Sequence, residues 1–335
     1  MKTAAIVGGG VIGAGWATRF VLNGVDISIF DPDPEAERKV SEVLDNARHA
    51  YTAMVPSGLP AEGAITYAQS IEEAVAPADL IQESVPERLE LKHKVLAEID
   101  AHASASALIG SSTSGLKPSD MQTAMANPDR LFVAHPFNPV YLLPVVEIVG
   151  GESTSPETIE RAKSAYASIG MKPVHVKKEI EAFVADRLLE AIWRESLWLI
   201  KDGICTTRDL DDIVRYGFGL RYAQMGVFDT YRVAGGEAGM RHFLAQFGPC
   251  LSWPWTKLMD VPDYDGALVD LIAGQSDEQS GHMSIREMER FRDENLVAIM
   301  DALSQQNDGK GWGAGENLNR YRSQLRQVKD RSNEL

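Results

Sequence analysis

A cluster of glycines between two apolar segments, close to the start of the chain, is the sequence feature that most restricts its fold. A short apolar run at 4–7 ends at the glycines, and a second run with alternating polarity follows at 26–30. The segment between them, 12–23, has the apolar spacing of a helix. This order predicts a strand, a tight turn, a helix and a second strand, which together make the βαβ unit of a parallel sheet.

The glycines have the spacing of a dinucleotide-binding turn. Gly8, Gly10 and Gly13 form a GxGxxG motif directly after the first apolar run, with Val11 and Ile12 at the mouth of the helix. Such a turn needs residues without a Cβ atom because a pyrophosphate must approach the backbone closely, and the helix N-terminus offers it amide donors. We therefore expect these five residues to contact a dinucleotide cofactor.

An acidic residue at the end of the second run predicts which dinucleotide is bound. Asp31 directly follows this run, at the distance from Gly13 that the dinucleotide-binding pattern requires. A carboxylate at this place accepts hydrogen bonds from the ribose hydroxyls and repels a 2′-phosphate, which favours NAD over NADP. Asp33 is interpreted instead as a solvated turn residue between two prolines.

Strands and helices alternate over about 180 residues, which is typical of an α/β protein. The pattern predicts further strands at 65–67, 79–85, 107–111, 131–135, 145–149 and 173–176, with helices at 34–54, 87–103 and 155–170. Beyond 180 the periodic segments are helical. We therefore expect a Rossmann-type, doubly wound parallel sheet over 1–180 that binds NAD. An all-α domain for substrate binding and dimerisation is expected over 181–335, with a loosely held polar tail from about 305.

The composition excludes several classes of protein. The chain has 335 residues, of which 44% are hydrophobic and 24% charged, and this balance is typical of a folded globular protein. A net charge of −15 disfavours binding to nucleic acid. Cys205 and Cys250 have no CxxC spacing, so we expect neither a disulfide framework nor a metal site. No segment approaches roughly 18 uninterrupted apolar residues, so we expect no membrane association and a cytoplasmic location.

Three segments beyond the nucleotide-binding half carry polar residues suited to the oxidation of an alcohol. They are SSTSGL at 111–116, HPFNP at 135–139, and PVVEIV, which contains Glu147. Hydride transfer from an alcohol requires a base for the hydroxyl proton, and histidine suits this task. His135 and Glu147 lie at the ends of two adjacent expected strands, where a carboxylate could hold the base in one tautomer. An HP dipeptide alone is more often structural than catalytic.

Together these segments resemble the 3-hydroxyacyl-CoA dehydrogenase family, whose pattern joins SxTSxL, HxFNP and a glutamate beyond the histidine. Ser114, His135 and Glu147 match this pattern in both order and spacing. The resemblance implies that His135 is the general base, Glu147 its orienting partner and Ser114 a hydrogen-bonding group for the substrate oxygen. It also places Glu87 and Lys92 near the nicotinamide and its ribose, and it implies a homodimer formed through the helical domain.

One segment departs from the family pattern. The family carries GFxxNR where this chain reads AFVADR, so that Ala182 replaces the glycine and Asp186 replaces the asparagine. A carboxylate has no evident use beside a phosphopantetheine thioester, whereas it would be favourable beside a cationic substrate. We therefore count Asp186 among the catalytic residues.

Aromatic residues are concentrated in the second half, where Trp193 and Trp198 precede a group between Tyr216 and Trp255. Aromatic residues of a helical domain usually belong to its core, yet as a group they offer faces for cation–π contacts with a quaternary ammonium. Segments such as YGFGLRYAQMG and FGPCLSWPW resemble the branch of the family that oxidises L-carnitine. The resemblance implies NAD-dependent oxidation of the 3-hydroxyl of L-carnitine to 3-dehydrocarnitine.

The sequence is also compatible with other functions. One is a dehydrogenase of another small 3-hydroxy acid, such as L-gulonate or 3-hydroxybutyrate, or of 3-hydroxyacyl-CoA. Another is a nucleotide-binding structural protein that resembles lambda-crystallin. Asp186 and the negative net charge of the chain disfavour an acyl-CoA substrate. The intact set of His135, Glu147 and Ser114 argues against a protein without catalytic activity.

Overall fold

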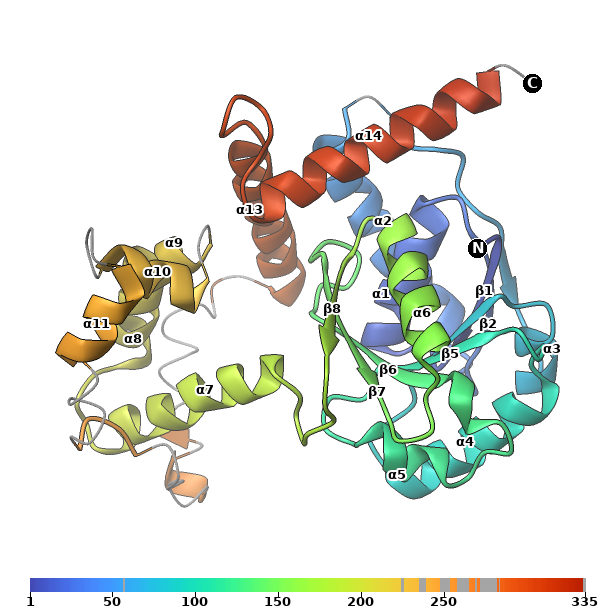
Figure 1. Ribbon diagram of the computed structural model, residues 1–335, viewed down its shortest axis with the longest axis horizontal. Coiled ribbons are helices and arrows are strands. Elements are labelled where there is room, and N and C mark those ends of the chain that lie inside the picture. Colours follow the sequence, from blue (N-terminus) through green and yellow to red (C-terminus); the bar gives the residue numbers. More distant parts are fainter. Residues whose placement is uncertain are drawn as a thin grey trace. The chain divides into compact units, whose positions relative to one another are not determined.

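The computed structural model describes residues 1–56, 58–223, 226–234, 239–247, 254–257, 265–268, 270–271, 282 and 284–333 (Figure 1). The chain divides into two compact units, of which the first combines Met1–Ala185 with Asp293–Leu335 and the second comprises Asp186–Arg292. The sequence patterns predicted one helical domain over 181–335. The structure corrects this division, because the last segment of the chain returns to the first unit.

The first unit is built on an eight-stranded sheet in the order β3-β2-β1-β4-β5-β6-β7-β8. Its strands are β1 (Thr3–Val7), β2 (Asp26–Phe30), β3 (Ile65–Tyr67), β4 (Leu80–Glu83), β5 (Leu108–Ser111), β6 (Leu131–Pro136), β7 (Val145–Gly150) and β8 (Lys172–Val176). The strands from β1 to β6 run parallel, β7 is antiparallel to β6, and β8 is parallel to β7. The predicted Rossmann-type sheet is confirmed, with the addition that its last two strands are reversed.

Helices cover both faces of this sheet (Figure 1). Successive side chains of a strand point to opposite faces, so Ile6 joins one buried cluster and Val7 joins the other. The first cluster packs against α1 (Val11–Leu22), α2 (Ala36–Met54) and α6 (Pro156–Ser168), and the second against α3 (Ile71–Val75), α4 (Leu89–His102) and α5 (Pro118–Gln122). The sequence did not predict α3, α5 or the 3₁₀ turn Pro128–Arg130, because such short elements show little periodicity.

The end of the chain contributes α13 (Ile285–Ser304) and α14 (Ala314–Asn333). Three apolar residues of α14, at 318, 321 and 325, are buried in the cluster that contains α1 and α2. The Tyr321 ring lies against Gly170, where φ is +78° and a Cβ atom would come within 2.6 Å of the ring. The expectation of a loosely held tail is therefore wrong, because these residues recur at helical spacing and cover part of the core.

The described part of the second unit is helical, as the sequence predicted. It contains α7 (Ala185–Lys201), which starts at the last residue of the first unit, then α8 (Thr207–Ile213), the π-helical turn η2 (Val214–Phe218), α9 (Gly219–Tyr222), α10 (Val227–Ala234) and α11 (Gly239–Phe247). Thr206 and Asp209 form a capping box that begins α8. No strand occurs among the residues of this unit that the structure describes.

Candidate active site

The glycine turn has the geometry that a dinucleotide needs. Gly8 has a φ of +101°, and a Cβ atom on it would lie 2.7 Å from the carbonyl oxygen of Ser84. A Cβ atom on Gly13 would lie 1.8 Å from the Gly8 oxygen, so α1 packs directly against the turn. A Cβ atom on Gly10, in contrast, would meet nothing within 4 Å. Gly10 therefore faces open space and leaves room for a ligand to approach the backbone.

The first turn of α1 offers hydrogen-bond donors beside these glycines. The amides of its first residues, Val11 and Ile12, have no acceptor within the helix, since the first amides of any helix lack one. Val11 is 70% exposed, and the first turn, which the structure describes in full, contains no acidic residue. The positive end of the helix dipole is thus open to an anion, and the pyrophosphate of a dinucleotide fits it.

Asp31 lies beside the glycine turn, directly after β2. Its Oδ2 accepts a hydrogen bond from the Gly9 amide at 2.5 Å, and its Oδ1 accepts one from the Asp33 amide at 2.8 Å. The carboxylate is half-buried, and each of its oxygens can accept a further hydrogen bond. It is therefore available to the hydroxyls of a ribose and fits NAD. Asp33 pairs with Lys39 on the exposed surface.

Strands β6 and β7 bring the expected base and its partner together. His135 and Glu147 face each other directly in the antiparallel register of the two strands. His135 Nδ1 lies 2.8 Å from Glu147 Oε2, and both side chains are buried. A carboxylate only accepts hydrogen bonds, so the imidazole donates from Nδ1, and in its neutral form it carries the lone pair on Nε2. This is the tautomer that can act as a base through Nε2.

The second oxygen of Glu147 is tied to the start of α7. Glu147 Oε1 accepts hydrogen bonds from the amides of Val184 and Ala185, both at 3.1 Å. The preceding residues, Ala182 and Phe183, have φ values of +60° and +47°, in the left-handed region that favours glycine. The buried Phe183 ring packs on the imidazole, with 5.6 Å between the ring centroids. One carboxylate therefore orients the His135 imidazole and anchors the chain where it enters α7.

Glu87 holds the loop that carries Ser114. Glu87 Oε1 accepts hydrogen bonds from the amides of Ser114 and Gly115, both at 3.1 Å, and from the Thr113 hydroxyl. Ser114 follows β5 and His135 lies in the neighbouring parallel strand, so both belong to the carboxyl edge of the sheet. Glu87 Oε1 contacts this loop, and Glu87 Oε2 lies 3.5 Å from Lys92 Nζ. The expected place of Glu87 near the nicotinamide ribose stays a prediction.

Lys92 pairs with Glu83, a residue that the sequence patterns did not single out. Lys92 Nζ lies 2.8 and 3.0 Å from the two carboxylate oxygens of Glu83 and 3.2 Å from the carbonyl oxygen of Val85. These contacts use all three ammonium donors, and both side chains are buried. Lys92 joins β4 to α4 in this structure, and its Nζ also lies 3.5 Å from Glu87 Oε2. Its expected place near the nicotinamide stays a prediction. The signal that could have revealed Glu83 is a charged residue within an apolar strand, because a buried carboxylate needs a partner.

Asp186 belongs to the other unit. It stands in the first turn of α7 and is the first residue of the second unit, whereas His135 and Glu147 lie in the first unit. A carboxylate in the first turn of a helix is stabilised by the helix dipole, which is a sufficient local reason for an acidic residue there. The part of Asp186 in the active site stays a prediction.

The aromatic residues of the second unit contact one another and the lysines of their own unit. Two ammonium groups, those of Lys201 and Lys257, lie 4.8 and 4.3 Å from the centre of the Trp198 ring. The rings of Tyr231 and Phe243 stack with 4.6 Å between their centroids. Some residues of the aromatic group, including Trp253, lie outside the described residues.

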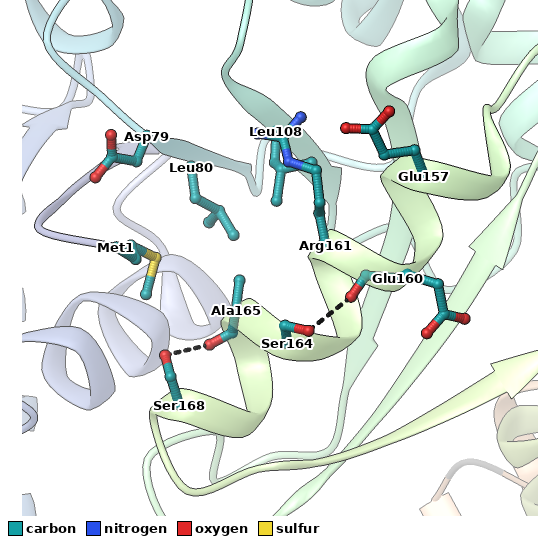
Figure 2. A pocket seen from close by; sticks show the side chains of 10 residues that line it. All are labelled: Met1, Asp79, Leu80, Leu108, Glu157, Glu160, Arg161, Ser164, Ala165 and Ser168. Atoms are coloured by element: carbon teal, nitrogen blue, oxygen red, sulfur yellow. Dashed lines mark hydrogen bonds between the residues drawn. The ribbon is translucent and has the colours of Figure 1, made fainter.

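A groove of about 560 Å³ lies at the opposite end of the sheet (Figure 2). It is lined by Leu80 and Leu108, the first residues of β4 and β5, and by one side of α6. The hydroxyls of Ser164 and Ser168 in this groove donate to backbone carbonyls of α6. Ligands of open α/β sheets bind at the carboxyl ends of the strands, where the glycine turn and the His135–Glu147 pair lie.

The described residues contain no cluster of three or more His, Cys, Asp or Glu side chains that could hold a metal ion. Cys205 is a free, half-buried thiol, and Cys250 lies outside the described residues. No helix in the described part of the chain is long and apolar enough to cross a bilayer.

The Rossmann-type sheet and its glycine turn define a domain that binds a dinucleotide cofactor. The family model of the 3-hydroxyacyl-CoA dehydrogenase NAD binding domain matches residues 3–180, and that of the 3-hydroxyacyl-CoA dehydrogenase C-terminal domain matches residues 183–260. The chain belongs to the 3-hydroxyacyl-CoA dehydrogenase family. It is an NAD-dependent oxidoreductase that acts on a CH–OH group.

Relatives extend the match over nearly the whole chain. The L-carnitine dehydrogenase of Mesorhizobium japonicum is 72% identical over 326 residues, which are 97% of this chain and 90% of that protein. The L-carnitine dehydrogenase/betainyl-CoA thioesterase of Rhizobium meliloti is 64% identical, and the match covers 96% of this chain but 65% of that protein. A solved structure of 5-formyl-3-hydroxy-2-methylpyridine 4-carboxylic acid 5-dehydrogenase, an NAD⁺-dependent dismutase, has a TM-score of 0.77 at 27% identity and covers 92% of this chain and 100% of its own.

Proposed function

We propose that this protein oxidises the 3-hydroxyl of L-carnitine to 3-dehydrocarnitine with NAD, by hydride transfer assisted by His135 and Glu147. The observation that carries the proposal is the buried pair with 2.8 Å between Nδ1 and Oε2, in a chain that is 72% identical to an L-carnitine dehydrogenase. The pair supports the removal of a hydroxyl proton, and the relative supports the substrate.

Oxidation of a secondary alcohol breaks one C–H bond and one O–H bond. NAD, when bound, supplies the acceptor for the hydride that leaves the C–H bond. His135 takes the hydroxyl proton on Nε2, and the O–H electron pair becomes the second bond of the carbonyl. Glu147 stabilises the imidazolium that forms, through its hydrogen bond to Nδ1. Ser114, exposed on the loop after β5, donates a hydrogen bond to the substrate oxygen.

The trimethylammonium group of L-carnitine distinguishes it from the other substrates that the family resemblance allows. We assign its recognition to aromatic faces of the second unit and to the carboxylate of Asp186, since a quaternary ammonium is attracted by both. The net charge of −15 supports a cationic substrate over one with a polyphosphate tail.

We also infer that the protein is a homodimer that forms through its helical unit. On α7, Leu188, Leu189, Ile192 and Trp193 are 47–56% exposed. Two apolar grooves, of about 640 and 400 Å³, are lined by residues of this helix and α8. Large exposed apolar patches commonly mark interfaces, and a second copy of the helical unit would cover this one. The cytoplasmic location stays a prediction from the sequence.

The test of the substrate is the rate of NADH formation with separate candidates. These are L-carnitine, D-carnitine, 3-hydroxybutyrate, L-gulonate and 3-hydroxybutyryl-CoA. L-carnitine should give the highest kcat/KM, and the analogue with a tert-butyl group in place of trimethylammonium should lose roughly 30-fold, because a desolvated cation–π contact is worth about 2 kcal/mol. If the neutral analogue or the CoA ester were turned over as well as L-carnitine, the carnitine assignment would be wrong.

The test of the cofactor compares NAD with NADP in the same assay. NADP should be a poor substitute, because its 2′-phosphate would meet the carboxylate of Asp31. In direct titrations, Asp31→Ala should weaken NAD binding by about 1.5–3 kcal/mol, the usual value of a hydrogen bond to a charged group. Equal kcat/KM for NAD and NADP in the wild-type protein would show that the carboxylate does not face the ribose.

A further inference from the structure

A series of polar side chains leads from the interior of the first unit to the glycine turn. The hydroxyl of Tyr166, a fully buried residue of α6, donates to Gln82 Oε1 at 2.5 Å. Gln82 Nε2 donates to Ser112 Oγ at 2.7 Å, and Trp16 Nε1 donates to the same oxygen at 3.1 Å. Ser112 Oγ lies 2.8 Å from Ser84 Oγ, the last member of the series.

The direction of each hydrogen bond follows from what each group can donate. The indole N–H of Trp16 can only donate, and burial raises the pKa of Tyr166 well above its ordinary value, so the phenol keeps its proton. If the Gln82 amide were turned over, its NH₂ group would face the phenol, and the buried phenolic proton would lose its acceptor. The oxygen of Ser112 therefore accepts two hydrogen bonds, and its own proton is donated to Ser84.

This leaves the proton of Ser84 pointing away from the interior. The Ser84 oxygen accepts the hydrogen bond from Ser112. Among the described residues, no carbonyl or carboxylate oxygen accepts a hydrogen bond from the Ser84 hydroxyl. Ser84 directly follows β4 and is half-buried, and its carbonyl oxygen would lie 2.7 Å from a Cβ atom on Gly8. An oriented donor therefore borders the turn to which the dinucleotide binds.

We propose that the Ser84 hydroxyl donates a hydrogen bond to an oxygen of the nicotinamide half of NAD, in a direction set by Tyr166. The order of the strands selects this half. Strands β1 to β3, with Asp31 after β2, form the half that holds the adenosine ribose, and Ser84 follows β4, the first strand of the other half. The proposal rests on NAD as the cofactor and does not depend on the identity of the substrate.

The first experiment measures binding by calorimetry in the absence of substrate. Ser84→Ala should bind NAD about five- to tenfold more weakly than the wild-type protein, the value of one neutral hydrogen bond. ADP lacks the nicotinamide half and should bind equally to both proteins. Unchanged affinity for NAD would overturn the proposal, and so would an equal loss of affinity for ADP. Neither result would alter the carnitine assignment, which is read from turnover.

The second experiment asks whether Tyr166 sets the direction of the bond. In Tyr166→Phe the Gln82 amide can turn over, and Ser84 can then donate inward to Ser112. Position 166 is fully buried, and we expect Tyr166→Phe to bind NAD about two- to fivefold more weakly than the wild-type protein. The double variant should bind NAD no more weakly than Ser84→Ala alone. Additive losses in the double variant would show general loosening of the fold and would overturn the assigned role of Tyr166.

Tyr51 provides the matched control for this cycle. It is another fully buried tyrosine of the same apolar cluster and has no part in the series of hydrogen bonds. Tyr51→Phe should leave NAD affinity unchanged, and thermal unfolding should show that each variant is folded. A loss in Tyr51→Phe equal to that in Tyr166→Phe would count against the proposal.

Discussion

Two buried pairs of side chains lie at the carboxyl edge of the same sheet and differ in how their carboxylates are used. Both oxygens of Glu83 contact the Lys92 ammonium, whose three donors are all engaged. The two oxygens of Glu147 have different partners. One contacts His135, and the other accepts hydrogen bonds from two backbone amides at the start of α7.

This difference separates a pair whose ammonium donors are all used from a pair that can pass a proton. Lys92 is the counterion of the buried Glu83, and a buried charge without a counterion is costly in free energy. When His135 gains a proton, in contrast, Glu147 acquires an ion-pair partner without moving. The first pair therefore joins β4 to α4, and the second is suited to chemistry.

The largest expected effect is on turnover at the second pair. His135→Gln should lower kcat by about 10²–10⁴-fold, because general base catalysis contributes about that much. NAD affinity should stay unchanged, since the residue lies outside the glycine turn. Steady-state rates and NAD titration check the two parts, and near wild-type turnover in the folded variant would remove His135 from the mechanism.

The next effect is on stability at the first pair. Lys92→Met should lower the free energy of unfolding by about 3–5 kcal/mol, because Glu83 is left as an uncompensated buried charge. Adding Glu83→Gln should recover part of this loss, because the amide carries no charge and its oxygen can still accept one of the hydrogen bonds that Val85 and Ser111 donate to Glu83. Urea denaturation followed by circular dichroism measures both variants. A loss below about 1 kcal/mol in Lys92→Met would contradict the structural role given to the pair.

Glu147→Gln tests whether tautomer control matters. The amides of Val184 and Ala185 fix the side-chain oxygen, so the new NH₂ group faces His135 Nδ1 and drives the imidazole proton to Nε2. The base then has its lone pair on the wrong nitrogen, and kcat should fall by about 10²-fold. Glu147→Ala permits both tautomers and should be less impaired. If Gln and Ala were equally active, the orientation argument would fail.

The smallest expected effect concerns a third pair, Asp100 with Arg130. Burial raises the pKa of Asp100, but Arg130 and two backbone amides lower it more, so the net shift is downward. Stability from this shift is present above the unfolded value of about 3.9 and is lost as the pH falls through the folded value. Asp100→Asn should cost about 1.5–3 kcal/mol at neutral pH and flatten the acid side of the Tm profile. An unchanged acid side would show that other carboxyl groups control unfolding there.

The sequence by itself determined the parts of the site that depend on local patterns. The glycine spacing and Asp31 predicted the nucleotide turn, because the motif occupies one strand–turn–helix connection. His135 and Glu147 are close enough in sequence to fit two adjacent strands, and the structure places the two residues opposite each other. Ala182 also had a local signal, since its left-handed backbone occupies the position of the family's glycine.

Only the tertiary structure decided which distant residues meet. Glu83 and Lys92, Gln82 and Tyr166, and Gly170 and Tyr321 contact each other because particular faces of strands and helices pack together. Hydrophobic periodicity tells which side of an element is buried, but it does not tell what that side packs against. For this reason the sequence patterns revealed neither the partner of Lys92 nor the return of α14 to the first unit.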